Sequence, residues 1–541
     1  MLNFLKCIGT ICLAATITST VVWADKARIA AELQSSQAVA NEVIVQYKVA
    51  PTDAHYGRVR KLGGTVRQSF DCVKSAHYSI SKAAIEALAQ DPDVESISPN
   101  RELRGMLDIP AATVNLTPAT MQQYDGTGIS VAVIDSGIAD LPQFHSRYNR
   151  VVYQATFVGG SPTDQYGHGT HVAGLIASDG NGTVYTGMAT GVNLINLRAL
   201  DGNGQGSDAS VIAAINAAIQ LKDTFNIRVI NLSLGRPVAG PYSYDPLCQA
   251  VEAAWRAGIV VVVAAGNEGR NNSANTQGYG TIMAPGNDPF AITVGAMKDM
   301  GTSNRSDDLI ASYSSKGPTL FDHVVKPDIL APGNRIVSTM PSTATMLQKN
   351  SIVKVAANEY VLSGTSMATP IVSGAVVVLL GAYDRFSPDQ VKARLMRTAS
   401  KTFPINSTAV DPVTKIAYTS YYDIFTVGAG YLDLGAALTE NSFSWGSAAS
   451  PTVSYDKLTG KVLLQGIGGS NSVWGGNLVW ANNLVWGNNI VWGNNVVWGN
   501  NLVWGSSYAA GFNIVWGSNV VWGCGDQVSG ESAAIAINGE P

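Results

Sequence analysis

The sequence predicts an α/β protein whose mostly parallel sheet carries helices on both faces. Residues 129–134, 229–232 and 259–265 are nearly continuous apolar runs, and residues 211–222 and 248–257 have a helical period. A strand that is apolar throughout is buried on both faces, as in a parallel sheet whose connections are helices. Ligands of such sheets bind beyond the carboxyl ends of the strands, so we expect the functional site there.

Length and charge bound the number of domains and the class of partner. The chain has 541 residues, which predicts about two to four domains. Its 39 acidic and 35 basic residues give a net charge of −4, and the sequence contains no basic block or stripe. This balance argues against a nucleic-acid partner.

Residues 1–24 are typical of a secretory signal peptide. Lys6 supplies a positive charge, residues 7–17 an apolar stretch, and residues 22–24 a small-residue cleavage site. We therefore expect a secreted, extracellular protein, with an uncleaved membrane anchor as the alternative. Residues 374–383 are apolar but too few to span a membrane, so they predict a buried helix.

Two further regions flank the predicted α/β domain of residues 106–440. Residues 25–105 predict a small α+β unit, with an alternating strand at 42–48 and a helix at 82–90 that Ser81 caps. Further strands are predicted at 77–80 and 94–97.

Residues 441–541 form a repeat tail of different composition. Its unit is roughly Asn-Asn-aliphatic-Val-Trp-Gly, and no Asp, Glu, Lys or Arg occurs from 462 to 525. Tryptophan recurs every six residues at positions 474, 480, 486, 492, 498 and 504, and again at 516 and 522. An even period keeps every Trp on one face of an extended strand. The tail is therefore predicted to be β-rich, with a low-complexity segment without a fold of its own as the alternative.

Four short segments bring together the residue types of a serine hydrolase. Val-Ile-Asp135-Ser-Gly supplies an acid, Gly-His168-Gly-Thr-His a base, Ala-Ala-Gly-Asn267 an amide and Gly-Thr-Ser366-Met-Ala a nucleophile. Serine attacks only when a base removes its proton, and the base needs an orienting acid. Ser366 begins an apolar helix whose first N–H groups favour developing negative charge, and the Asn267 amide is the second predicted donor to that charge.

Each segment alone has an ordinary alternative. Asp135 and Asn267 suit turns, and Ser366 suits a helix N-cap. His168 and His171 have the i, i+3 spacing of a metal pair, although no third ligand motif follows them. A lipase or esterase would need Gly-x-Ser-x-Gly and an acid between the serine and the histidine, and this sequence has neither. The combination therefore favours the serine hydrolase.

Across residues 106–440 the chain resembles the subtilisin-like serine peptidases. The order acid, histidine, asparagine, serine is theirs, and so are Gly-His-Gly-Thr-His-Val-Ala-Gly at 167–174 and Gly-Thr-Ser-Met-Ala-Thr-Pro at 364–370. The resemblance implies the subtilisin-like α/β fold and a serine endopeptidase that works through an acyl-enzyme. It gives these roles: Ser366 the nucleophile, His168 the proton shuttle, Asp135 the orienting acid and Asn267 the oxyanion donor.

The resemblance also implies how substrate is bound. In the family, the backbone that matches residues 233–235 pairs with the peptide as an added strand. Together with the segment matching 264–266 it lines the first specificity pocket, whose implied floor is Gly278. Small walls and a glycine floor lead us to expect a large apolar side chain there. The implied substrate-binding residues are Ser233, Leu234, Gly235, Ala264, Ala265, Gly266 and Gly278.

Two more features follow from the same resemblance. Residues 25–105 resemble the family's inhibitory propeptide, a ferredoxin-like α+β unit that is removed by self-cleavage between residues 99 and 110. We therefore expect protein and peptide substrates and the chain's own propeptide as an internal inhibitor. No cofactor is expected for the chemistry, but Asp179 and Asn181 lie where the family has a calcium loop and are candidates for a structural calcium site.

The tail of residues 441–541 supports an alternative function. A charge-free array rich in Val and Trp is a surface for β-pairing. The protein would then act in surface adhesion or assembly, through cell-surface retention or self-association of this tail, and the peptidase part would only mature the molecule.

Overall fold

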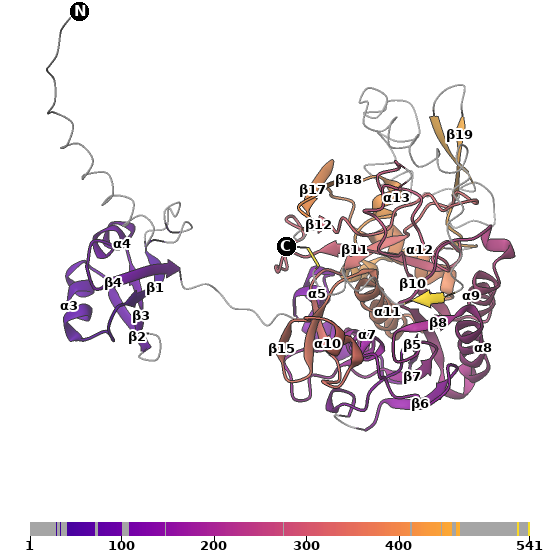
Figure 1. The fold of residues 1–541 in the computed structure, drawn as a ribbon, viewed down its shortest axis with the longest axis horizontal. Coiled ribbons are helices and arrows are strands. Elements are labelled where there is room, and N and C mark those ends of the chain that lie inside the picture. The colour runs from indigo at the N-terminus through magenta and orange to yellow at the C-terminus, as the bar shows by residue number, and fades with distance from the viewer. Residues whose placement is uncertain are drawn as a thin grey trace, which may run out of the picture. The chain divides into compact units, whose positions relative to one another are not determined.

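The chain divides into two units, Met1–Arg104 and Gly105–Pro541 (Figure 1). The computed structural model describes residues 29, 33, 40–70, 74–99, 108–145, 148–273, 275–411, 414–444, 446–456, 461–465, 527–529 and 539–540. The predicted signal peptide and the tryptophan repeats between 466 and 526 lie outside the described residues.

The first unit is an antiparallel sheet with two helices, arranged βαββαβ along the chain. Its elements are β1 (Asn41–Tyr47), α3 (Asp53–Lys61), β2 (Thr65–Phe70), β3 (Ser75–Ile80), α4 (Lys82–Leu88) and β4 (Val94–Pro99). The strands lie in the order β2-β3-β1-β4, and each neighbouring pair is antiparallel. This connectivity is that of a ferredoxin-like α+β unit.

Local sequence explains these elements. In β1, Val43, Val45 and Tyr47 are buried and alternate with more exposed residues, so one face of the strand packs on the core. Ser81 caps α4 as expected, because its hydroxyl accepts a hydrogen bond from the Ala84 N–H at 3.2 Å. The sequence-based prediction missed α3 and β2, since α3 is mostly polar and β2 is a largely exposed edge strand without alternation.

The second unit is built on an eight-stranded sheet. Its strands are β5 (Ser130–Asp135), β6 (Val151–Thr156), β7 (Asn193–Arg198), β9 (Ile227–Leu232), β10 (Val260–Ala264), β11 (Ile292–Lys298), β12 (Leu309–Ile310) and β13 (Ile329–Pro332). They lie in the order β12-β11-β10-β9-β5-β7-β6, with β13 paired to β11. The β11–β12 pairing is antiparallel and the others are parallel. Every residue of β5 and β10 is buried, as their apolar runs predict.

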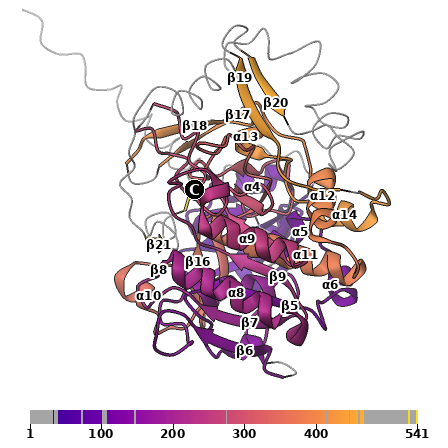
Figure 2. The same cartoon turned by 90° about the vertical axis from the view of Figure 1, so that its right-hand side faces the viewer.

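Four long helices cover this sheet: α7 (His168–Ala177), α8 (Asp208–Phe225), α9 (Pro246–Arg256) and α11 (Thr365–Ala382). Helices α8 and α9 pack on each other (Figure 2), and α7 packs on α11. Helix α11 contacts β9, β10, β11 and β13. The predicted α/β fold with a mostly parallel sheet and covering helices is therefore confirmed.

Helix α11 runs through the core and has the predicted nucleophile, Ser366, in its first turn. Within the described part of the chain it is the one helix long and apolar enough to cross a membrane, yet 89% of it is buried inside the second unit. The sequence predicts an apolar helix that begins at Ser366, and the observed helix begins one residue earlier, at Thr365, with Gly364 as its N-cap. The apolar side chains of α11 pack against the strands of the sheet and against α7.

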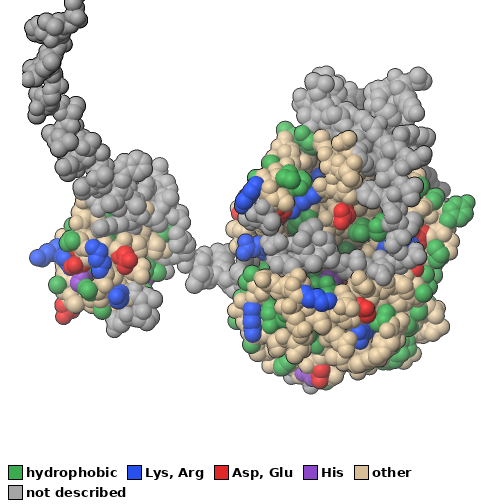
Figure 3. Space-filling model, in the orientation of Figure 1, with side chains coloured by type: hydrophobic (Ala, Val, Ile, Leu, Met, Phe, Trp, Pro, Cys, Tyr) green, Lys and Arg blue, Asp and Glu red, His purple; other side chains and the backbone are tan. Residues whose placement is uncertain are grey.

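Shorter elements complete the second unit. They include α5 (Asp108–Thr113), α6 (Pro118–Gln123), η2 (Pro142–Phe144), β8 (Gln205–Ser207), η3 (Tyr242–Tyr244), β14 (Ile336–Thr339), α10 (Thr345–Lys349), β15 (Lys354–Ala356), β16 (Glu359–Leu362), α12 (Pro388–Thr398), β17 (Asn406–Val410), β18 (Ala417–Tyr421), α13 (Ile424–Val427) and α14 (Leu434–Thr439). Figure 3 shows charged side chains scattered singly over the visible face of this unit, so no continuous charged surface appears there.

Part of the predicted tail packs into the second unit. Ala448 and Val453 belong to an apolar cluster with residues of α12 and α13, and the Lys392 ammonium donates to the Ser450 hydroxyl at 2.8 Å. Strands β19 (Thr452–Asp456) and β20 (Lys461–Gln465) then form a hairpin. Farther along, β21 (Gln527–Ser529) pairs antiparallel with β8, next to which it is drawn as the yellow arrow in Figure 1.

Candidate active site

Asp135 and His168 are in direct contact in the core of the second unit. Asp135 is the last residue of β5, and His168 is the first residue of α7. The His168 Nδ1 lies 2.8 Å from one Asp135 carboxylate oxygen and 3.0 Å from the other, and both side chains are fully buried. A carboxylate accepts only, so Nδ1 carries a proton and the histidine tautomer is fixed, with Nε2 as its basic nitrogen.

A glycine makes this approach possible. Gly169 follows the histidine, and a Cβ at that position would lie 2.3 Å from the Gly137 carbonyl oxygen and 3.1 Å from the Asp135 Cβ. Any side chain there would push α7 away from the end of β5. The Gly-His-Gly motif therefore serves the contact between the acid and the histidine.

Asp164, which the sequence reasoning missed, forms hydrogen bonds with residues adjacent to both Asp135 and His168. Its carboxylate accepts hydrogen bonds from the Ser136 hydroxyl at 2.9 Å, the Gly167 N–H at 2.8 Å and the Thr170 hydroxyl at 2.6 Å. Ser136 follows the acid, and Gly167 precedes the histidine. Burial raises the pKa of Asp164, and the hydrogen bonds from Thr170 and Gly167 oppose that rise. A single acid in a glycine-rich loop gives no distinct sequence signal.

Ser366 is the second residue of α11. Gly364 caps the helix with a φ of +144°, a conformation that favours glycine, and its N–H donates to the Gly333 carbonyl at 2.7 Å. In the first turn of a helix the N–H groups lack a carbonyl partner within the helix. The Ser366 N–H therefore sits where it can donate to a developing negative charge.

Asn267 lies against the start of α11. Its side-chain oxygen accepts from the Thr365 N–H at 3.0 Å and the Thr365 hydroxyl at 3.2 Å. Because an N–H needs an acceptor, this contact sets the amide so that its NH₂ faces away from Thr365. The amide donor that the sequence predicts is thereby oriented by the residue next to the nucleophile.

The predicted site residues form two hydrogen-bonded sets. Asp135 and His168 are one set. The other joins Ser366 to Ser233, whose hydroxyl donates to the Ser366 carbonyl at 2.9 Å, and to Asn267 through Thr365. Helix α7 packs on α11, so the two sets belong to neighbouring helices at one side of the sheet.

The implied substrate-binding segments converge on Met283. A Cβ on Gly235 would lie 3.1 Å from the Met283 Cβ, and one on Gly266 would lie 2.6 Å from its Cγ. The partly exposed Met283 side chain therefore lies against both implied walls of the specificity pocket. The sequence reasoning did not find it, because nothing local to residue 283 marks it as a pocket residue.

The other implied pocket residues lie on the same two loops. Leu234 and Ala265 are buried, and Ala264 ends β10. Gly278 has a φ of +83°, and a Cβ there would lie 1.8 Å from the Gly269 carbonyl oxygen, so this position requires glycine for packing against backbone.

The calcium candidates are engaged by protein groups. The Arg150 guanidinium contacts an Asp179 carboxylate oxygen at 3.1 Å, and both side chains are buried. The other oxygen accepts the Asn181 N–H at 3.0 Å, and the Asn181 amide donates to the Pro142 carbonyl at 3.1 Å. A calcium ion takes six to eight oxygen ligands, and a buried guanidinium among them does not fit such a site. The calcium prediction stays open to a direct test of Tm with and without a chelator.

His171 does not join His168 as a ligand pair. Its Nε2 lies 3.1 Å from the Tyr360 carbonyl oxygen, to which it donates. Burial lowers the pKa of His171 to about 3, so it is a neutral core residue. Within the described ranges, no group of three or more His, Cys, Asp or Glu side chains is placed to hold a metal ion.

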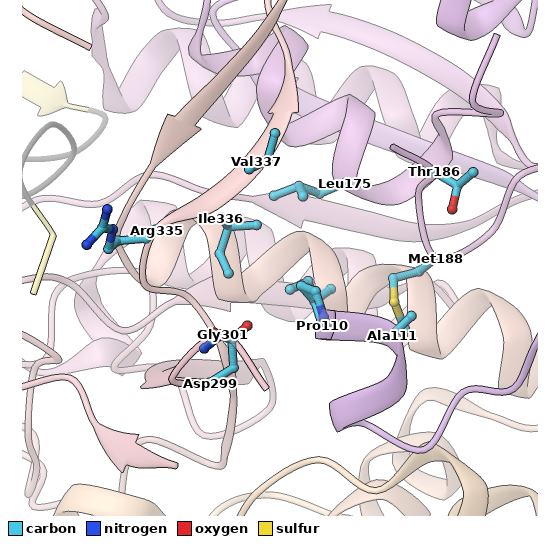
Figure 4. A pocket seen from close by; sticks show the side chains of 11 residues that line it. Pro110, Ala111, Leu175, Thr186, Met188, Asp299, Gly301, Arg335, Ile336 and Val337 are labelled. Atoms are coloured by element: carbon cyan, nitrogen blue, oxygen red, sulfur yellow. Dashed lines mark hydrogen bonds between the residues drawn. The ribbon is translucent and has the colours of Figure 1, made fainter. Parts of the chain in front are cut away.

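A separate cavity of about 60 Å³ is lined in part by the same two helices (Figure 4). Leu175 of α7 and Ile371 of α11 contribute to its lining, together with Met188 and Ile336. None of the predicted site residues lines it, so it is not the centre of the chemistry.

Comparison with known proteins assigns the family. The sequence pattern described as "Subtilase family" matches residues 126–446. Serine protease AprX of Bacillus subtilis (strain 168) is 35% identical over 352 residues, covering 62% of this chain and 76% of that protein. Subtilisin DY of Bacillus licheniformis is 38% identical over 282 residues, covering 52% and 86%. Extracellular serine proteinase of Thermus sp. (strain Rt41A) is 35% identical over 336 residues, covering 60% and 70%.

The match spans more than half of the chain and includes all four segments that carry the acid, the histidine, the amide and the serine. The fold, the buried acid–histidine contact and the serine at a helix N-terminus agree with it. The chain therefore belongs to the subtilase family and is a serine-type endopeptidase.

Proposed function

We propose that Asp135, His168 and Ser366 are the catalytic triad of this endopeptidase. The Ser366 Oγ adds to the carbonyl carbon of the scissile peptide bond while its proton passes to the His168 Nε2. The intermediate then expels the amine, which takes that proton, and leaves an acyl-enzyme. Water then adds to the ester carbon while His168 takes its proton, and that proton passes to the Ser366 Oγ as the C–Oγ bond breaks and the acid product leaves. The Asp135 carboxylate at 2.8 Å from Nδ1 stabilises the charged imidazole in both halves of the reaction.

We assign the oxyanion to the Asn267 amide and the Ser366 N–H. The Thr365 contact orients the Asn267 NH₂, and the helix position supplies the second donor. Both donors are fixed before substrate arrives, so they stabilise the negative oxygen without reorganisation. An Asn267→Ala variant is expected to lose about 10²–10³ in kcat, as is typical for the loss of one such donor.

The substrate edge is assigned to residues 233–235. Arg236 follows that segment, and its guanidinium pairs with Asp208, directly after β8, at 2.8 Å. This ion pair anchors the end of the segment that would pair with a peptide as an added strand.

The observation that carries the proposal is the buried His168–Asp135 contact at 2.8 Å. A fluorophosphonate probe, followed by mass spectrometry, tests it by locating the reactive serine. Ser366 should be labelled in the wild type and not in Ser366→Ala, and an Asp135→Asn variant should label far more slowly. Ser306→Ala, an exposed serine outside the site, is the matched control. Labelling of a different serine would contradict the assignment.

We further propose export and self-maturation. Residues 1–24 have the composition of a signal peptide, and one relative is named an extracellular serine proteinase. The first unit has its own buried core, as expected of an independently folding propeptide. Ser366→Ala should then accumulate with residues 25–105 still attached, measured by mass spectrometry of the secreted chain. Normal processing of that variant would show that another protease removes the segment.

A test of the adhesion hypothesis needs a deletion that leaves the folded core of the second unit intact. Residues 446–456 pack into the second unit, so removing everything from 441 would damage its core. Deleting residues 466–526 instead should leave casein hydrolysis unchanged if the repeats serve retention or assembly, and cell-surface retention should fall.

A further inference from the structure

Glu540 is buried inside the second unit, far along the chain from the residues around it. Its relative exposure is 0%, although most charged side chains of a protein face solvent. The groups around it come from the loop after β10, the end of β11, the loop after β12 and the β13–β14 connection. They are Arg270, Lys298, Ser312 and Asn334.

The carboxylate is bound by two cations and one serine. The Arg270 guanidinium donates to Oε1 at 2.7 Å, and the Lys298 ammonium lies 3.2 Å from Oε2. The Ser312 N–H donates to Oε1 at 2.9 Å, and its hydroxyl donates to the same oxygen. Arg270 also pairs with Asp411, so two cations face two carboxylates and the buried charges balance.

The backbone of this segment is bound as well. The Glu540 N–H donates to the Asn334 side-chain oxygen at 2.7 Å, and the Asn334 amide donates to the Glu540 carbonyl at 2.8 Å. Gly539 has a φ of +55°, and a Cβ there would lie 2.4 Å from the Ser363 hydroxyl and 2.9 Å from the Arg335 Cγ. The pocket therefore favours glycine at position 539 and an acid at position 540.

We propose that Gly539–Glu540 is the internal ligand of a carboxylate-binding pocket on the second unit, formed by Arg270, Lys298, Ser312 and Asn334. Before the repeats, β19 and β20 form a hairpin that belongs to the same unit. After the repeats, on the same side as Glu540, β21 pairs with β8. Docking of Glu540 therefore attaches the chain to the second unit on the C-terminal side of residues 466–526.

The balance between the buried cations and carboxylates supports a site that is specific for Glu540. Removing Glu540 would leave Arg270 and Lys298, with side chains 16% and 7% exposed, facing one carboxylate instead of two. Loss of one partner of a buried ion pair costs about 3–5 kcal/mol, which corresponds to about 10²–10⁴ in the docking equilibrium.

A cut in the repeats tests the attachment in the full-length chain. A site for a sequence-specific protease is inserted between Gly505 and Ser506, in a Ser366→Ala background that prevents self-cleavage. After the cut, the fragment that contains Glu540 should stay with the body of the protein on size-exclusion chromatography. In Glu540→Gln it should dissociate about 10²-fold faster. Asp223→Asn, which removes one charge from a side chain that is 96% exposed, is the matched control.

Gly539→Ala supplies an independent variant, with Gly240→Ala as its control, because a Cβ on Gly240 meets nothing within 4 Å. Gly539→Ala should also speed dissociation, and Gly240→Ala should not. Circular dichroism verifies that every variant is folded. Equal dissociation of the wild-type, Glu540→Gln and Gly539→Ala fragments would overturn the proposal.

Discussion

Ser233 and Ser366 exchange hydrogen bonds. The Ser233 hydroxyl donates to the Ser366 carbonyl at 2.9 Å, and the Ser366 hydroxyl donates to the Ser233 carbonyl at 3.2 Å. The Asn231 amide donates to the Ser233 hydroxyl at 3.0 Å, which anchors the pair to β9. The loop assigned to substrate pairing and the proposed nucleophile are therefore held by one another, and a change in one displaces both.

A Ser233→Ala variant removes one half of this exchange. A hydrogen bond of this kind contributes about 0.5–1.5 kcal/mol, so kcat is expected to fall about twofold to tenfold as α11 loses a restraint. Initial rates on a peptide anilide measure it. Ser306→Ala, which removes an exposed hydroxyl, should leave kcat unchanged; an equal fall in both variants would contradict the role of Ser233.

An Asp164→Asn variant should weaken the contact between the acid and the histidine. The amide NH₂ would face N–H and O–H donors that now point at a carboxylate oxygen, and a buried donor without an acceptor costs about 1–3 kcal/mol. We expect a loss of that size in the free energy of unfolding and a lower kcat. Urea unfolding and peptide hydrolysis measure the two effects, with Asp223→Asn as the control. Unchanged kcat would show that Asp164 only stabilises the fold.

Met283 should set the size of the first specificity pocket. Because it lies against Gly235 and Gly266, Met283→Ala should enlarge the space between the two walls. The kcat/KM ratio for Phe over Ala at the cleaved residue is expected to rise about tenfold or more, since a few methylene groups in a pocket contribute about 1–3 kcal/mol. A peptide library measures this ratio, and Met300→Ala, an exposed methionine, is the control. An unchanged ratio would remove Met283 from the pocket.

His171 should make the protein less stable in acid. Burial lowers its pKa to about 3 in the folded chain, whereas the unfolded value is about 6.5. Between these values the unfolded chain binds a proton that the folded chain does not. The free energy of unfolding therefore falls as pH drops from 6.5 towards 3, by up to about 1.4 kcal/mol per pH unit from this residue.

His171→Gln should reduce that pH dependence, because glutamine keeps a donor for the Tyr360 carbonyl and does not titrate. Urea unfolding at several pH values between 4 and 7, in a Ser366→Ala background, measures the two slopes. Parallel slopes for the two proteins would exclude His171 as the titrating group.

Apolar periodicity predicted the strands and long helices well, because their burial is encoded locally. Residues 129–134, 229–232 and 259–265 match β5, β9 and β10 within one or two residues. The acid, histidine, amide and serine segments were also visible, since each keeps its own local motif. Asp164 and Met283 were not, because their roles arise from contacts with residues distant in the sequence.

The pocket around Glu540 illustrates the same limit. Arg270, Lys298 and Glu540 are ordinary charged residues in the sequence, and only the fold brings the two cations within 2.7 Å and 3.2 Å of the Glu540 carboxylate. Likewise, composition placed residues 446–456 with the tail, but their buried contacts are with the second unit. Local pattern finds elements and motifs; it does not find ion pairs between loops.

Helix α11 has a consequence for when the enzyme becomes active. It rests on β9, β10, β11 and β13, which come from a stretch of about a hundred residues that precedes it. These contacts are long-range, and such topologies fold slowly because loop closure must precede them. A nascent chain that ends before Ala382 lacks part of the helix that holds Ser366 against these strands. The active site can therefore form only after nearly the whole domain has been synthesised and folded.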